Sequence, residues 1–354
     1  MSRFFSERYK DVIPYVPGEQ PKDMQYIKLN TNESPFPPSP KAQAMVAEAA
    51  KNLQLYSDPQ CKVLNEKAAE MFGISTDEVL FGNGSDELLY FAFMAFCDEK
   101  HPVAFPDITY GFYSVYAQFL GINAQQIPLK DDFTIDINDY IGLNKTIFIA
   151  NPNAPTGLAL PLSDIEVIVK SNPDNVVVID EAYVDFGWVS AIQLIHKYDN
   201  LLVIQTLSKS RSMAGGRLGF AVGSKALISD LNTIKFSTNP FNVNRMSMAA
   251  GLGALEDTEY FQTNCRKIME NRQWTTDQLR ALGFTVVDSM TNFVLAKHPA
   301  LEGKGFYLKL KENGILVRHF DTPRLRDYNR ITIGSVREMQ VFIEVTKKIL
   351  EDAQ

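Results

Sequence analysis

The stretches VVVIDEAYVDF (residues 176–186) and LLVIQTLSKSRSMAGGRLGFAVG (residues 201–223) decide the fold of this chain. Each begins with a run of β-branched and aliphatic residues and continues into polar residues, which is typical of a buried strand followed by a loop. The first run ends at Asp180 and the second at Thr206. Because ligands bind beyond the carboxyl ends of strands in open α/β sheets, the polar residues after each run are the candidates for a functional site.

Further apolar runs alternate with helical patterns between about residues 30 and 250. These runs are VLFG (79–82), PVAFP (102–106), TIFIAN (146–151) and LGFAVG (218–223). The alternation predicts an α/β fold, in which a mainly parallel sheet is covered by helices on both faces. We therefore expect a large three-layer domain at residues 30–250.

The two ends of the chain have different patterns. Residues 1–29 are rich in proline and tyrosine and predict an extended arm. After residue 250, a long helical stretch precedes short strand patterns such as NFVLAK (292–297) and RITIG (330–334), which predict a smaller α+β domain at residues 251–354. A chain of 354 residues commonly divides into two such domains.

Composition excludes several classes of function. The net charge of −7 provides no basic surface for nucleic acid, and no uncharged stretch of membrane-spanning length or secretory signal occurs. The three cysteines lie far apart, which favours reduced thiols and a cytoplasmic protein. The four histidines lack metal-ligand spacing, so no metal site is expected.

An acid, a phenol and an amine follow the two central runs. Asp180 is suited to face the nitrogen of a pyridine ring and keep it protonated, and Tyr183 could form a hydrogen bond with a phenolic oxygen on that ring. Lys209 can hold an aldehyde covalently and later move a proton as a free amine. This combination predicts pyridoxal 5'-phosphate (PLP) as the cofactor, with Asp180, Tyr183 and Lys209 as catalytic residues.

A phosphate group also requires a binding site. In FGNGSDE (81–87), Gly84 permits a tight turn, and Ser85 and Asp86 begin a helix whose amides point at an anion. We expect the Asp86 amide to serve while its carboxylate points away. Arg217 can grip phosphate with two parallel hydrogen bonds. Two hydroxyls, those of Thr206 and Ser208, complete the expected phosphate site.

The order of NPNAPTG (151–157), DEAYVDF (180–186) and SKSRSMAGGRLG (208–219) resembles that in fold-type I aminotransferases. The segments PYVPGEQP (14–21), KLNTNESPFPPSP (28–40), GNGSDE (82–87) and NPFNVN (239–244), with the ending GILVR...RITIG, make nearly the whole chain similar to the histidinol-phosphate aminotransferases. The resemblance implies the fold of type I PLP-dependent transferases. It also implies a homodimer with shared active sites.

The resemblance also implies roles for individual residues. Tyr56 would reach the cofactor phosphate of the partner subunit, and Tyr110 would stack on the cofactor ring. Arg330 would bind the substrate carboxylate with Arg318 nearby, and Tyr15 on the arm would lie at the phosphate end of the substrate.

One position departs from the pattern of the family. The family usually carries asparagine immediately before Pro-Thr-Gly, where it contacts the phenolic oxygen of the cofactor, but this chain has Ala154. Either Asn153 reaches that oxygen, or Tyr183 and a water molecule replace the missing contact. Both alternatives are compatible with PLP.

The reaction implied is transamination between histidinol phosphate and 2-oxoglutarate, giving imidazole acetol phosphate and glutamate in histidine biosynthesis. An aromatic amino acid aminotransferase and a phosphothreonine decarboxylase would share all the cofactor residues. A PLP-binding transcriptional regulator would need an additional helix-turn-helix domain, for which the chain has no room. The intact lysine, aspartate and arginine argue against an inactive scaffold.

Overall fold

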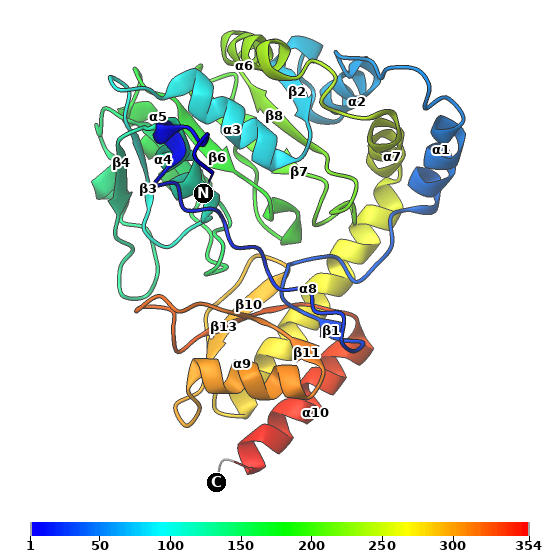
Figure 1. Ribbon diagram of the computed structural model, residues 1–354, viewed down its shortest axis with the longest axis vertical. Coiled ribbons are helices and arrows are strands. Elements are labelled where there is room, and N and C mark those ends of the chain that lie inside the picture. Colours follow the sequence, from blue (N-terminus) through cyan, green and yellow to red (C-terminus); the bar gives the residue numbers. More distant parts are fainter. Residues whose placement is uncertain (1, 353–354) are drawn as a thin grey trace.

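The computed structural model describes residues 2–352, and its centre is a seven-stranded sheet (Figure 1). The strand order is β2-β8-β7-β6-β5-β3-β4, in which β8 runs antiparallel to both neighbours and all other pairs are parallel. The strands are β2 (Val79–Gly82), β3 (Val103–Pro106), β4 (Ala124–Ile127), β5 (Thr146–Ala150), β6 (Val177–Asp180), β7 (Leu201–Thr206) and β8 (Gly219–Gly223). The mainly parallel sheet is confirmed.

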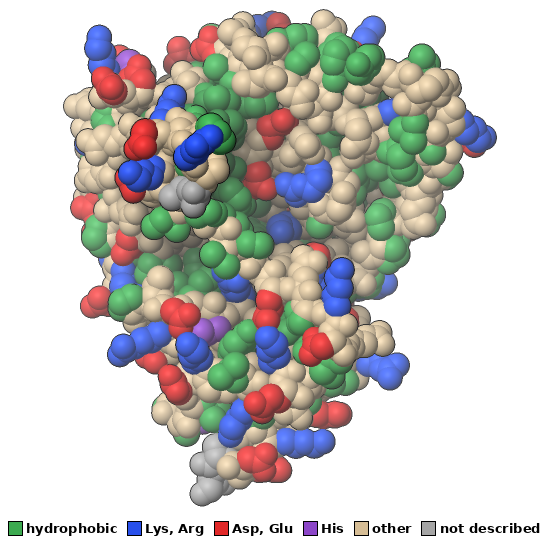
Figure 2. All heavy atoms as spheres, in the orientation of Figure 1, with side chains coloured by type: hydrophobic (Ala, Val, Ile, Leu, Met, Phe, Trp, Pro, Cys, Tyr) green, Lys and Arg blue, Asp and Glu red, His purple; other side chains and the backbone are tan. Residues whose placement is uncertain are grey.

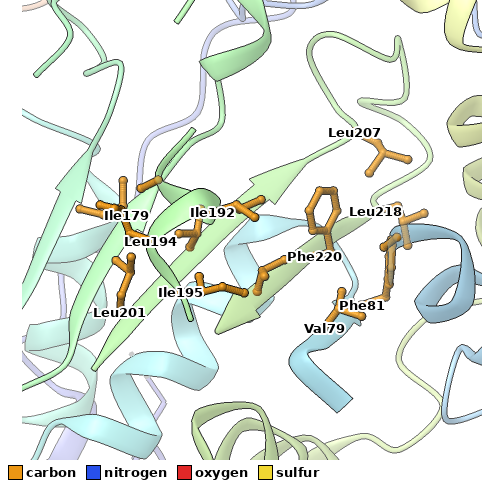
Figure 3. Close-up of a cluster of buried hydrophobic side chains, with 14 of the residues drawn as sticks. Val79, Phe81, Ile179, Ile192, Leu194, Ile195, Leu201, Leu207, Leu218 and Phe220 are labelled. Atoms are coloured by element: carbon orange, nitrogen blue, oxygen red, sulfur yellow. The ribbon is translucent and has the colours of Figure 1, made fainter. Parts of the chain in front are cut away.

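Alternate residues of the central strands enter two separate cores. In β5, Ile147 and Ile149 point into one core and Phe148 into the other. The first core, part of which Figure 3 shows, is covered by α2 (Lys62–Phe72), α5 (Leu162–Ser171) and α7 (Arg245–Glu256). The second is covered by α3 (Ser85–Phe96), α4 (Phe112–Leu120) and α6 (Lys225–Thr238). Helix α1 (Pro40–Ala50) packs on α7. The sheet is therefore the middle of three layers, as expected.

A second part of the molecule follows helix α8 (Thr258–Ala281), which leads from the upper to the lower part of Figure 1. It contains the antiparallel sheet β12-β13-β10-β9, made of β9 (Thr285–Val286), β10 (Phe293–Lys297), β12 (Arg318–His319) and β13 (Asn329–Thr332). Helices α9 (Gly303–Glu312) and α10 (Val336–Glu351) join α8 in a core of its own. We propose that the two parts are the large and small domains expected at 30–250 and 251–354.

The N-terminal segment contacts both parts. Tyr9 stacks on Phe119 of α4 at a centroid distance of 4.8 Å, which fixes the start of the segment to the large sheet domain. Further along, β1 (Ile27–Lys28) pairs in parallel with β11 (Ile315–Leu316) of the smaller part. The arm thus crosses from one part to the other (Figure 1). Within residues 2–352 no helix is both long and apolar enough to span a bilayer.

Gly219, at the start of β8, lies where the backbone of the large sheet packs closely against the turn after β2, and a substitution there tests this contact. A Cβ atom at Gly219 would lie 2.6 Å from the amide nitrogen of Ser85 and 2.8 Å from the carbonyl oxygen of Gln205. Because both contacts are with backbone, Gly219→Ala is expected to lower the free energy of unfolding by about 2–3 kcal/mol. Urea unfolding of the apoprotein measures this. Gly215→Ala is the control, since its Cβ would meet no atom within 4 Å; equal losses in both variants would contradict the close approach.

Candidate active site

The carboxyl ends of β6 and β7 and the turn after β2 border the smaller of two adjoining cavities. The smaller one, of about 80 Å³, is lined by Ser85, Asp86, Tyr110, Ala150, Pro152, Ala154, Asp180, Ala182, Tyr183, Thr206, Ser208, Lys209 and Arg217. The larger one, of about 760 Å³, shares Tyr110, Ala154, Tyr183 and Lys209 with it. Figure 2 shows acidic and basic side chains gathered in the hollow between the upper and lower parts of this face. Most of the site residues predicted from the sequence therefore line one connected space.

Asp180, the last residue of β6, is a buried carboxylate at the end of the smaller cavity. Its Oδ2 accepts a hydrogen bond from the hydroxyl of Tyr113 at 2.8 Å, and its Oδ1 accepts one from the amide of Ala182 at 3.3 Å. Burial raises the pKa of Asp180 to about 6, although these two donors act in the opposite direction. At neutral pH the site therefore holds a desolvated negative charge, which favours a cationic partner.

Lys209 lies in the loop after β7 and borders both cavities. Its Nζ donates only to the carbonyl oxygen of Thr31, at a long 3.4 Å, among the described residues 2–352. Burial, and next the positive charge of Arg330, lower the pKa of Lys209 to about 8. A substantial fraction of this amine is therefore neutral near physiological pH, as a nucleophilic lysine must be.

The turn between β2 and α3 is where the sequence predicts an anion site. Gly84 has φ of 83°, and a Cβ atom there would lie 2.6 Å from Nη2 of Arg217. The glycine thus lets the guanidinium come close to the first amides of α3, which begins at Ser85. Near the same place, Thr206 donates its hydroxyl to that of Ser208 at 3.0 Å.

The expectation that the carboxylate of Asp86 points away from the site is wrong. Its Oδ2 accepts a hydrogen bond from Arg217 at 2.8 Å, and its Oδ1 accepts one from the hydroxyl of Tyr110 at 2.6 Å. The physical reason is that a guanidinium brought close to the helix start needs an anionic partner, and Asp86 is the nearest carboxylate. Asp86 therefore orients Arg217 and Tyr110 within the site.

Tyr183 stands at the boundary of the two cavities. Its hydroxyl accepts a hydrogen bond from the side-chain amide of Asn32 at 2.8 Å, and its ring meets Phe293 edge-on at a centroid distance of 5.2 Å. The Nζ of Lys209 lies 6.0 Å from the centroid of the Tyr183 ring. The phenol and the amine thus face the same space, as the sequence predicts.

The structure does not bring Asn153 into this group. Its amide nitrogen donates to the carbonyl oxygen of Ile108 and to the hydroxyl of Thr156, and its amide oxygen accepts from the hydroxyl of Thr109. Asn153 lines a different cavity, whereas Ala154 borders both cavities at Lys209. These three hydrogen bonds occupy the side chain of Asn153, so the alternative in which Asn153 replaces the contact missing at Ala154 is not supported.

Three residues predicted for the substrate line the larger cavity. Arg330 donates to the carbonyl oxygen of Asn30 at 3.0 Å, and its buried Nε has no partner among residues 2–352. Arg318 donates to the carbonyl oxygens of residues 16 and 17 at 3.2 and 3.3 Å. Tyr15 stacks on Phe112 at a centroid distance of 4.3 Å. Arg330 is therefore the freer of the two cations, while Arg318 also fixes the arm.

Tyr56 lies outside both cavities of its own chain. It is 81% exposed and stacks on Phe241 at a centroid distance of 4.7 Å. The backbone around it is fixed, because Arg245 donates to the carbonyl oxygen of Tyr56 and Ser57 donates to that of Val243. A large aromatic side chain is thus held rigidly on the surface.

Two residues of the site were missed by the sequence reasoning, namely Asn32 and Tyr113. Tyr113 lies in the first turn of α4, only three residues after Tyr110, and this closeness in the sequence could have indicated a second phenol near the same site. Asn32 is 2% exposed and has φ of 55°, but it lies far from Tyr183 in the sequence. No local pattern links those two residues, so only the fold shows that they meet.

Known proteins resemble this chain over almost its whole length. The family model for aminotransferase class I and II matches residues 24–345. A histidinol-phosphate aminotransferase of Brachyspira hyodysenteriae is 50% identical, and the match covers 99% of this chain and 100% of the relative. A protein of the same description from Clostridium acetobutylicum is 47% identical, with the same coverage.

A solved structure agrees with the fold. The histidinol-phosphate aminotransferase from Sinorhizobium meliloti, solved in complex with pyridoxal-5'-phosphate, superimposes with a TM-score of 0.85. The superposition covers 92% of this chain and 92% of that one, at 24% identity. At this identity the similarity concerns the fold.

The buried carboxylate gives a stability prediction for the apoprotein. The pKa of Asp180 is about 6 when folded, above its ordinary 3.8, so folding loses stability as pH rises from about 4 to about 6 and does not regain it above. Asp180→Asn removes this loss and should make the apoprotein more stable by about 1–3 kcal/mol at pH 8.

Urea unfolding at several pH values measures the free energy of unfolding of Asp180→Asn and of the wild type. The extra stability of Asp180→Asn should shrink as the pH falls towards 4.5. The same exchange at the exposed Asp139 is the control. A gain at Asp180 that does not change with pH would contradict the account of a desolvated carboxylate.

Proposed function

The chain belongs to the aminotransferase class I and II family, and from this membership we propose that it transfers the amino group of histidinol phosphate to 2-oxoglutarate. Its cofactor is PLP, and the reaction gives imidazole acetol phosphate and glutamate in histidine biosynthesis. The observation that carries the proposal is the convergence of Asp180, Lys209 and Arg217 on one cavity, which adjoins a larger cavity lined by Arg330.

The residues present fit PLP. The phosphate fits the amides at the start of α3 beside Arg217. A Cβ atom at Gly84 would keep the Arg217 guanidinium away from this place. The carboxylate of Asp180, which has no cationic partner of its own within residues 2–352, suits a protonated ring nitrogen. Lys209 would hold the aldehyde carbon covalently, and Tyr183 would face the phenolic oxygen. When bound, the cofactor withdraws electrons from the substrate carbon that carries the amino group.

The protein residues then handle protons and position the substrate. Lys209, with its lowered pKa, can accept the proton that leaves the substrate carbon and can then deliver it to the cofactor carbon. Asp180 keeps the ring nitrogen cationic through its charge. Arg330 can bind an anion through donors that the protein itself leaves free. These roles require no metal ion.

The anionic ends of both substrates suit the larger cavity. Its arginines are Arg318, Arg324 and Arg330, and of these Arg324 is already paired with Asp107. Arg330 lies against the rings of Phe293 and Phe320, with its guanidinium carbon 5.2 and 5.8 Å from their centroids. A guanidinium set between apolar rings is weakly hydrated, which favours the binding of a phosphate or a carboxylate.

We also propose a homodimer in which each subunit completes the site of the other, acting in the cytoplasm where its three buried thiols stay reduced. The support is a surface loop with Leu53, Leu55 and Tyr56, whose exposed fractions are 56%, 57% and 81%. Phe241, 42% exposed, lies beside them. Contiguous exposed apolar side chains mark protein interaction sites, and Tyr56 could thereby reach the phosphate of the partner's cofactor.

The assignment of Lys209 predicts that Lys209→Ala loses both the visible absorbance of the bound cofactor and the transaminase activity. The activity should fall at least about 1000-fold, because the covalent anchor and the proton carrier are both removed. Lys197→Ala, at an exposed position, is the control. Separate titrations with histidinol phosphate, phenylalanine, phosphothreonine and glutamate, followed by the absorbance of the wild-type protein, identify which of these amines is a substrate. Full activity in Lys209→Ala would disprove the assignment.

Shared active sites predict that two inactive variants restore activity when mixed. A hybrid of Lys209→Ala and Tyr56→Ala chains has one site with an intact Lys209 and an intact Tyr56 from the other subunit. After unfolding and joint refolding, the mixture should regain about a quarter of the wild-type activity, because half of the dimers are hybrids with one restored site. Absence of recovery, with Tyr56→Ala clearly impaired by itself, would show that Tyr56 does not act across subunits.

A further inference from the structure

Asn32 lies in the KLNTNESPFPPSP segment, and no role in the reaction has been assigned to it above. It is buried, with a left-handed φ of 55°, and its side chain points to the hydroxyl of Tyr183 at 2.8 Å. Asn292 holds its backbone by donating to the Asn32 carbonyl oxygen at 2.9 Å. Asn32 is therefore fixed in position beside a residue that faces the cofactor.

Thr332 decides which way the amide of Asn32 is turned. The backbone N–H of Asn32 can only donate, and it donates to the hydroxyl oxygen of Thr332 at 3.0 Å. The hydroxyl of Thr332 in turn donates its own hydrogen to Oδ1 of Asn32 at 3.0 Å. Thr332 is 1% exposed, so the opposite amide orientation would leave its hydrogen buried without an acceptor among residues 2–352. The oxygen of the amide therefore faces Thr332 and the nitrogen faces Tyr183.

This orientation sets the direction of the hydrogen bond at Tyr183. Because Nδ2 of Asn32 donates, the oxygen of Tyr183 accepts, and the hydrogen of Tyr183 is left without an acceptor among residues 2–352. Tyr183 borders both cavities that meet at Lys209. Ala154, which borders the same cavities, has no hydrogen-bonding side chain to offer there. The hydroxyl hydrogen of Tyr183 is thus free for a ligand oxygen.

Two paired strand residues of the smaller part act on Tyr183. Thr332 of β13 lies directly opposite Phe293 of β10 in the antiparallel register. Phe293 meets the ring of Tyr183 edge-on, while Thr332 orients the amide that reaches its hydroxyl. The same pair of residues therefore fixes both the ring plane and the hydroxyl direction of Tyr183.

We propose that Asn32 is a positioning residue, which, oriented by Thr332, keeps the Tyr183 hydroxyl turned so that it donates to the phenolic oxygen of the cofactor. This inference rests on the proposed function and deepens it, because it explains how the site works with Ala154. A donor to that oxygen stabilises its negative charge, so the site keeps the phenolic oxygen ionised down to a lower pH than it would otherwise.

The test uses the pH titration of the visible absorbance of the protein with PLP bound. Asn32→Asp has the same shape, but its carboxylate can only accept, so it draws the Tyr183 hydrogen away from the cofactor. The midpoint of the titration should rise by about one pH unit, a tenfold change in proton affinity. Thr332→Val should raise the midpoint less, and Thr332→Ser, which keeps the hydroxyl, should leave it near that of the wild type.

Two further variants separate the direction of the hydrogen bond from the added charge. Asn30→Asp places a carboxylate close by, on a side chain that donates to the carbonyl oxygen of Glu19 and does not contact Tyr183. It should move the midpoint less than Asn32→Asp does. A Tyr183→Phe protein should itself have a higher midpoint than the wild type. In that background, Asn32→Asp should raise the midpoint no more than Asn30→Asp does.

The outcomes distinguish this inference from the proposed function. If the wild-type protein binds PLP and transaminates, but Asn32→Asp and Thr332→Val titrate like the wild type, then Asn32 does not orient Tyr183 and the function stands. The inference also fails if Asn32→Asp raises the midpoint equally with and without the Tyr183 hydroxyl. A wild-type protein that takes up no PLP would instead overturn the proposed function.

Discussion

The site depends on charged groups that the fold keeps out of water without giving them full partners. The carboxylate of Asp180 is buried and, among the described residues 2–352, receives hydrogen bonds only from Tyr113 and Ala182. Within the same part of the chain, Lys209 makes one long hydrogen bond, to the carbonyl oxygen of Thr31. Groups in this condition have shifted pKa values and a high affinity for a ligand that supplies the missing charges. The two cores that cover the large sheet provide the stability that offsets this cost.

The two parts of the chain meet through backbone as much as through side chains. The strand at residues 27–28 pairs with β11, and the next residues pass between the two parts beside Lys209. Arg330 donates to the carbonyl oxygen of Asn30, and Arg318 donates to the arm at residues 16 and 17. The segment from the arm to Asn32 therefore forms one wall of the larger cavity. A movement of the smaller part would change the substrate end and the hydroxyl of Tyr183 together.

Much of the fold could be predicted from the sequence because its signals are local. Runs such as VVVI (176–179) and LLVI (201–204) are wholly apolar, as expected of strands that are covered on both faces and buried along their length. Asp180 could be placed because it ends β6, and Lys209 and Arg217 could be placed because they lie in the loop between β7 and β8. The resemblance to a known family added the roles of Arg330 and of Tyr15 on the arm, which the physical pattern alone did not assign.

The remaining features depend on contacts between distant segments. The sequence cannot show that the carboxylate of Asp86 meets Arg217, because that contact requires the turn at Gly84 to lie against β8. The side chain of Asn153 is occupied by Thr156 of its own loop and by Ile108 and Thr109 of the loop after β3, contacts that the motif NPNAPTG does not show. Asn32 and Thr332 are brought together only when the arm side of the chain packs on β13.

The central claim is that Lys209 is the lysine that holds the cofactor. Reduction of the PLP-loaded protein with borohydride, followed by digestion and mass spectrometry, identifies the modified lysine directly. The pyridoxyl group should be found on the peptide that contains Lys209. Lys235 is another buried lysine whose pKa is lowered by burial, and it should remain unmodified. A pyridoxyl group on Lys235 or on any other lysine, with Lys209 unmodified, would contradict the account.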